Sequence, residues 1–174
     1  TEKFGVPMVE ANGAARSLFT KGYKYLFAVL NSADQYLSSA VDLAADVNKK
    51  AGKKPSSIKV AMAFEQDAFS LDVKLGVMER IKHHGMKVVI DDALPKELND
   101  MTATLQKVKA LKPDLLIVSG HSKGAMTGVK QITDLKVDVP LIAMTHCDAA
   151  SINKKLGAGN GDYVLCGSQW HKSL

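Results

Sequence analysis

Short apolar runs alternate with segments of helical periodicity along most of this 174-residue chain. Five runs rich in Val, Ile, Leu, Ala and Met indicate buried strands, at residues 57–64, 86–90, 115–118, 139–144 and 163–166. The segments between them indicate helices, at residues 69–84, about 99–112, about 123–135 and 149–156. An earlier strand at 25–29 leads into a helix over about 34–51. This alternation predicts an α/β fold with a doubly wound parallel sheet in three layers, α/β/α.

Composition narrows the class of protein further. A length of 174 residues predicts one domain, and 46% hydrophobic with 24% charged residues is enough for a full core. These values exclude a disordered tail, a disulfide-stapled miniprotein and a coiled coil. No apolar run approaches the roughly 18 residues of a membrane helix, so we expect no direct membrane insertion. The net charge is +5, but the lysines are scattered without interleaved aromatic residues, which favours a solvated basic surface over a nucleic-acid site.

Ligands of doubly wound sheets bind beyond the carboxyl ends of the strands. The residues expected at that edge are Gln66, Asp67 and Phe69, then Asp91 and Asp92, and the segments 119–123, 145–148 and 167–170. Cys147 and Cys166 fall at the ends of two expected neighbouring strands, and both a disulfide and two free thiols remain open. His121, His146, Cys147 and Asp148 lack the spacing of a preformed metal site, and no phosphate-binding glycine loop is present, so we expect no metal and no cofactor.

Residues 120–124 read Gly-His-Ser-Lys-Gly, which matches the G-x-S-x-G pattern of a serine nucleophile elbow. The pattern stands between a buried strand and a helix, and Asp148 and His171 follow in hydrolase order. This supports an alternative function, a serine hydrolase with Ser122 as nucleophile. The competing interpretation, a strand-to-helix turn with a capping serine, is favoured because no His-Gly-Gly oxyanion segment precedes the pattern.

Several segments together resemble the substrate-binding proteins of ABC importers, in the branched-chain amino-acid and amide branch of the type I periplasmic binding fold. The segments are residues 2–9, 19–27, 60–69, 99–105, 112–114 and 161–165. The resemblance implies a two-lobed protein of about twice this length that traps its ligand between the lobes. It assigns residues 1–27 to the end of the first lobe and a hinge crossing, 28–167 to the second α/β lobe, and 168–174 to the start of the return hinge. The chain is therefore expected to be a fragment.

The family's ligand contacts carry over only in part. The first-lobe segment that holds an amino acid corresponds to Asn12 and Gly13, without the hydroxyl, and the second-lobe tyrosine corresponds to Phe69. The acid that clamps the ligand's ammonium corresponds to Thr145. A buried ammonium without a carboxylate partner costs several kcal/mol. The departures therefore favour an amide, a carboxylate or an aromatic acid over a standard α-amino acid.

The resemblance implies a non-enzymatic, periplasmic or extracellular solute-binding component that closes by a hinge and delivers its small-molecule ligand to a membrane permease. A sensor lobe is a further alternative, because the fold is reused in receptors. The expected pocket has apolar walls with imidazole donors and neutral polar contacts. Its candidate residues are Asn12, Gly13, Gln66, Phe69, His121, Ser122, Thr145, His146 and Trp170.

Overall fold

A five-stranded parallel sheet forms the body of the protein in the computed structural model, which describes residues 1–167. The strand order is β4-β3-β5-β6-β7. The strands are β3 (Lys59–Glu65), β4 (Lys87–Leu94), β5 (Leu115–Ser119), β6 (Leu141–Met144) and β7 (Val164–Cys166). The parallel, doubly wound sheet predicted from the sequence is confirmed.

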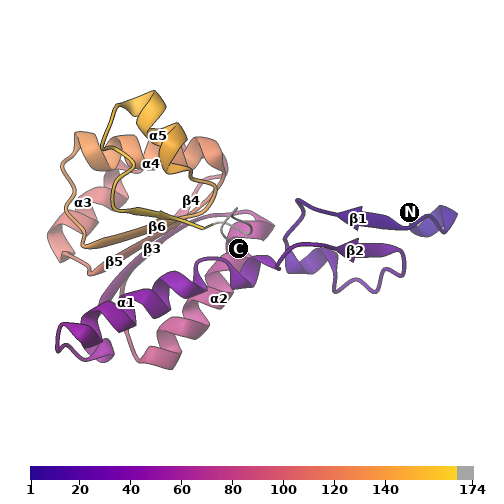
Figure 1. The fold of residues 1–174 in the computed structure, drawn as a ribbon, viewed down its shortest axis with the longest axis horizontal. Helices are drawn as coiled ribbons and strands as arrows, with labels where there is room; N and C mark the ends of the chain where they lie inside the picture. The colour runs from indigo at the N-terminus through magenta and orange to yellow at the C-terminus, as the bar shows by residue number, and fades with distance from the viewer. Residues whose placement is uncertain (168–174) are drawn as a thin grey trace.

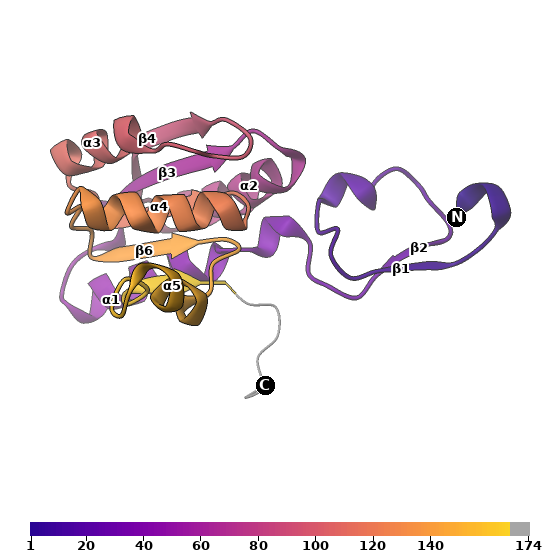
Figure 2. The same ribbon diagram turned by 90° about the horizontal axis from the view of Figure 1, so that it is seen from above.

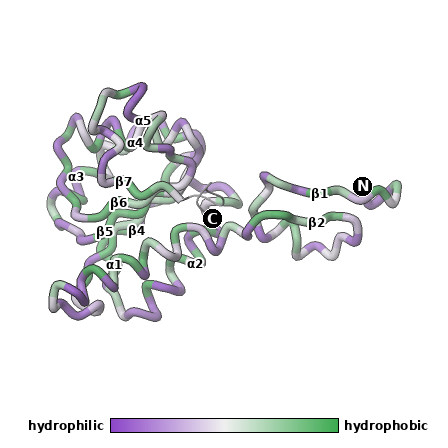
Figure 3. Tube along the Cα trace, in the orientation of Figure 1, coloured by the Kyte–Doolittle hydropathy of each residue, from purple (hydrophilic) through white to green (hydrophobic). Residues whose placement is uncertain are grey.

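Helices cover both faces of the sheet, as Figure 1 shows. One face is covered by α1 (Ser38–Lys50) and α2 (Ala68–His84). The other is covered by α3 (Thr102–Leu111), α4 (Ser122–Asp134) and α5 (Ala149–Leu156). Side chains of the interior strand β3 alternate between the two faces, since Met62 and Phe64 belong to the first core and Ala63 to the second. Apolar colouring accordingly follows the strands in Figure 3.

The first 30 residues form a separate ribbon beside this body (Figures 1 and 2). It contains the 3-10 turns Glu2–Phe4 and Arg16–Leu18 and the strands β1 (Met8–Glu10) and β2 (Leu26–Ala28), which pair in parallel. A further turn, Ala33–Gln35, joins the ribbon to α1, and another, Pro55–Ser57, precedes β3. The turn at Ala33–Gln35 packs closely on α2, where a Cβ at Gly76 would lie 1.6 Å from the Asp34 carbonyl oxygen.

Two boundaries differ from the sequence prediction. The helix expected over about 34–51 is interrupted, because Tyr36 is extended and Leu37 is left-handed (φ 58°) before α1 begins at Ser38. The strand expected at 86–90 continues to Leu94, so Asp91 and Asp92 lie within β4 rather than beyond it. Both are held there by lysines, with Lys74 on Asp91 and Lys107 on Asp92. These two aspartates are therefore not loop residues of the ligand edge, and that expectation is wrong.

No helix in residues 1–167 is long and apolar enough to cross a membrane.

Candidate functional site

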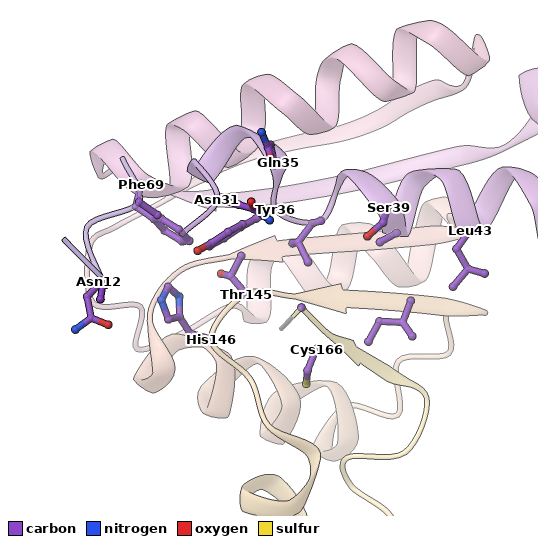
Figure 4. Close-up of a pocket in the computed structure, with 16 residues that line it drawn as sticks. Asn12, Asn31, Gln35, Tyr36, Ser39, Leu43, Phe69, Thr145, His146 and Cys166 are labelled. Atoms are coloured by element: carbon purple, nitrogen blue, oxygen red, sulfur yellow. The ribbon is translucent and has the colours of Figure 1, made fainter. Parts of the chain in front are cut away.

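A cavity of about 770 Å³ opens at the carboxyl edge of the sheet (Figure 4). Four parts of the chain contribute to its wall: the segment around Asn12, the stretch from Asn31 into α1, Phe69 at the start of α2, and the ends of β6 and β7. Figure 4 shows Asn12, Tyr36, Phe69 and His146 gathered at one end of it. The cavity thus lies where the ribbon meets the α/β body.

Aromatic rings form one wall of the cavity. Phe69 packs edge-on against Tyr36, with ring centroids 5.4 Å apart, and against His146 at 4.9 Å. The backbone of Phe69 is held by the start of α2, where Asp67 Oδ1 accepts hydrogen bonds from the amides of Phe69 and Ser70. Burial raises the pKa of the Tyr36 phenol, which therefore stays a neutral hydrogen-bond donor at physiological pH.

The loop after β6 is fixed to the end of β5 through Gly120. The buried Thr145 hydroxyl accepts from the Gly120 amide (3.0 Å) and donates to the Gly120 carbonyl (2.8 Å). His146 Nδ1 lies 2.9 Å from the same carbonyl oxygen. Because a carbonyl can only accept, Nδ1 carries a hydrogen, and Nε2 is the ring nitrogen that remains for a ligand. The ring is thereby oriented before any ligand binds.

A disulfide between Cys147 and Cys166 ties this loop to the end of β7. The sequence left a disulfide and two free thiols open, and the structure has the disulfide. Cys166 also contributes to the cavity wall, so the bond fixes one rim of the cavity.

The structure brings some predicted residues to the cavity and leaves others away from it. Asn12, Phe69, Thr145 and His146 line it. Gly13, Gln66, His121 and Ser122 are not among its lining residues in the described part of the chain, and Trp170 lies outside that part. His121 does not line the cavity but packs against a residue that does, since its ring centroid lies 5.2 Å from the ring centroid of His146. Sequence reasoning missed Asn31, although it follows the strand predicted at 25–29. It also missed Gln35 and Tyr36, because the break before α1 left no signal in the periodicity.

The Gly-His-Ser-Lys-Gly segment does not form a capped serine turn. His121 is the N-cap residue of α4, its side chain makes no capping hydrogen bond, and Ser122 is the exposed first residue of the helix. The segment is the expected strand-to-helix turn between β5 and α4, but the capping role predicted for its serine is wrong. Asp148, the acid expected for a hydrolase, instead caps α5 by accepting from the Ser151 amide (2.9 Å), and His171 lies outside the described residues.

The two glycines of that segment accommodate Glu65, which was not among the predicted site residues. A Cβ on Gly120 would lie 2.3 Å from Glu65 Oε1, and one on Gly124 would lie 2.5 Å from it. Glu65 ends β3, is only 1% exposed, and accepts a hydrogen bond from the Leu98 amide at 3.3 Å. The spacing of the glycines therefore reflects the close approach of a buried carboxylate.

Comparisons with known proteins agree with this architecture. A model of the family described as periplasmic binding protein matches residues 1–174. A Leu/Ile/Val-binding protein homologue of Brucella abortus is 21% identical over 135 residues, which are 77% of this chain and 34% of that protein. A leucine binding protein of Thermotoga maritima superposes with a TM-score of 0.73 at 19% identity, covering 98% of this chain and 46% of that one. A Rhodopseudomonas palustris solute binding protein in complex with 4-hydroxybenzoate gives 0.67 at 23%, covering 82% and 37%.

The chain spans about a third of the curated relative and less than half of each of these solved chains.

Proposed function

Because this chain belongs to the periplasmic binding protein family, we propose that it is part of the extracytoplasmic solute-binding component of an ABC importer. Its role is to hold a small organic ligand and present it to the membrane permease. Members of this family are non-enzymatic components of transport systems, so family membership does not support the serine-hydrolase alternative. Residues 28–167 act as the second ligand-binding lobe, residues 1–27 as the end of the first lobe and a hinge crossing, and 168–174 as the start of the return.

The observation that supports this function best is the cavity at the junction of ribbon and body. Asn12 belongs to the proposed first-lobe segment, whereas Phe69, Thr145 and His146 belong to the α/β body. A ligand held between these groups is touched from both sides of the hinge. Rotation of one lobe toward the other then buries the ligand, and hinge closure of this kind is how two-lobed binders trap their solutes.

The chemistry of the wall favours an aromatic acid. None of the described lining residues is acidic, so a ligand ammonium would find no carboxylate there. Phe69 and Tyr36 offer ring faces and edges, which suit an aromatic ligand. Asn12, Asn31 and the Tyr36 hydroxyl offer donors, and His146 Nε2, when the ring is neutral, accepts from a ligand hydroxyl. This combination fits a hydroxylated benzoate better than leucine.

Two facts from outside the cavity support the proposal. Two of the similar Rhodopseudomonas palustris proteins were solved in complex with 3,4-dihydroxybenzoic acid and 4-hydroxybenzoate, which shows that this fold accepts such ligands. The Cys147–Cys166 disulfide suits an oxidising compartment, as expected of a periplasmic or extracellular protein.

Isothermal titration of the protein with 4-hydroxybenzoate, benzoate, benzamide and leucine tests the ligand class. We expect saturable binding of the aromatic acids and at least roughly 10-fold weaker binding of leucine, because its ammonium is unpaired. Phe69→Ala removes the central ring of the wall, and we expect it to weaken benzoate binding by about 10-fold or more.

Phe4→Ala is the matched control, because Phe4 is exposed at the far end of the ribbon and contributes nothing to the cavity. Preferential binding of leucine would contradict the proposed ligand class, and equal effects of Phe69→Ala and Phe4→Ala would contradict the proposed site.

A further inference from the structure

Two acidic side chains and a histidine converge at the carboxyl edge of the sheet, next to the cavity wall. Glu65 ends β3, Asp67 precedes α2 and His121 precedes α4. One ligand atom from each lies within 4.8 Å of the other two. We propose that Glu65, Asp67 and His121 bind a divalent transition-metal ion. The site is independent of the ligand class proposed for the cavity.

The distance between two of the three groups is close to that found in a metal centre. Ligand atoms bonded to zinc at about 2.0–2.2 Å in a tetrahedron lie roughly 3.4 Å from one another. His121 Nε2 lies 3.8 Å from Asp67 Oδ1, within a few tenths of an ångström of this spacing. The His121 side chain is 57% exposed, so its ring is free to rotate inward over the small remaining gap.

Unsatisfied polar atoms give an independent indication of a missing partner. Glu65 Oε2 and Asp67 Oδ2 are both buried, and neither has a hydrogen-bond partner among the described residues. An unpaired carboxylate oxygen in the interior is costly, and buried charges are normally paired or bound to a metal. Within residues 1–167, no lysine or arginine forms an ion pair with either side chain. A divalent cation would compensate both carboxylates at once.

The surrounding backbone holds the two carboxylates in place. Gly120 and Gly124 leave space for Glu65, and the Leu98 amide donates to its Oε1. Asp67 Oδ1 is held by the first amides of α2. Hydrogen bonds of this kind orient the ligands of metal sites and limit their rearrangement. The carboxylates are thus positioned, and His121 closes the site from the exposed side.

The donor set selects the class of ion. One imidazole and two carboxylates suit zinc, manganese or ferrous iron better than calcium, which takes six to eight oxygen ligands. Three protein ligands also leave at least one coordination position for water. Zinc is therefore the probe of choice, with cobalt as its spectroscopic substitute.

Titration of the metal-stripped, untagged protein with ZnCl₂ tests the proposal. We expect one zinc ion per chain and a rise in melting temperature of at least roughly 5 °C at saturation. Cobalt should give the d–d absorption of a four- or five-coordinate ion. His121→Ala should weaken zinc binding by at least about 10-fold, since even changes outside the coordination sphere cost about 10–100-fold.

Matched variants separate this site from adventitious binding. His83→Ala removes an exposed histidine from the end of α2 and should leave zinc affinity unchanged. Asp67→Asn retains a side-chain acceptor for the α2 amides but loses the charge, so the fold should be kept while zinc binding weakens. Weak binding at several sites, or equal effects of His121→Ala and His83→Ala, would overturn the proposal. A melting temperature that zinc leaves unchanged would overturn it too, because an ion that binds the folded state must stabilise it.

Discussion

Glu65 shows at the scale of single residues how a correct pattern can suggest the wrong chemistry. Gly120 and Gly124 have the spacing of a nucleophile elbow, and a side chain at either position would indeed collide with a neighbouring group. What they admit is the carboxylate of Glu65, 55 residues before Gly120 in the chain. Sequence spacing reports that something approaches the backbone closely, but only the pairing of β3 with β5 determines what approaches.

Replacement of Gly124 tests this packing. We expect Gly124→Ala to lower the free energy of unfolding by about 1–3 kcal/mol, because its Cβ would lie 2.5 Å from Glu65 Oε1 and 3.2 Å from Leu98 Cβ. The loss should outweigh the gain of about 1 kcal/mol in helix propensity. Urea unfolding followed by circular dichroism measures the difference.

Gly128→Ala in the same helix is the control. Its Cβ would meet the sulfur of Met101 at 3.1 Å, and that flexible side chain can move aside. This variant should be neutral or slightly stabilised. A Gly124→Ala protein as stable as Gly128→Ala would show that Glu65 is not tightly packed between these residues.

At the scale of elements, the sequence predicted the buried strands and failed where polar residues enter regular structure. β5, buried at every position, was predicted almost to the residue. β4 was cut short because Asp91 and Asp92 looked like loop residues. An edge strand tolerates such charges, and β4 stands at the edge of the sheet. The lining of the cavity was likewise only partly predictable from the sequence. Thr145 and His146 follow a predicted strand, whereas the position of Tyr36 depends on a break that interrupts a predicted helix.

An ion-pair cluster joins α1 to α2. Asp42 Oδ1 accepts from Arg80 Nε (2.9 Å) and Nη2 (2.6 Å), and lies 2.6 Å from His84 Nε2. Burial alone would raise the pKa of the Asp42 carboxyl, but the hydrogen bonds from His84 and Arg80 outweigh it and hold the pKa below its ordinary value of 3.8. The ionised form is therefore the one that stabilises the fold.

The pH dependence of stability follows from the direction of this shift. A lowered pKa in the folded state gives stabilisation that is complete above the unfolded value and is lost as pH falls through the folded value. Asp42→Asn should lower the free energy of unfolding by about 0.5–1 kcal/mol at pH 6, because the cluster is one-third exposed and screened by solvent. The difference from the unmodified protein should shrink below about pH 4.

Urea titrations from pH 7 to pH 3 measure that difference. Asp46→Asn, an exposed change on the same helix, serves as the control and should shift stability little at any pH. A constant difference between the Asp42→Asn and unmodified proteins down to pH 3 would contradict the role of the ionised Asp42.

At the scale of the whole molecule, the ribbon and the body differ in how well they are packed. The body has two buried cores, one on each face of its sheet. The ribbon has a single pair of three-residue strands and exposes most of its apolar side chains. Those exposed residues include Phe4, Val6, Met8, Val9, Phe27 and Val29. Such a surface is typical of a segment that packs against further structure, which agrees with its proposed place in the first lobe.

Hydrogen exchange of the 174-residue chain tests this difference. Two short paired strands without a covered face are marginally stable in water, so the amides of Met8–Glu10 and Leu26–Ala28 should exchange at least roughly 100-fold faster than those of β3 and β5. Slower exchange is expected near Ala33, whose amide donates to the Ala14 carbonyl, and near Arg16, whose amide donates to Asp72 of α2, because these bonds attach the ribbon to the body. Exchange in β1 as slow as in β3 would contradict the prediction. The ribbon would then be stable alone, and its exposed apolar residues would no longer support a packing partner.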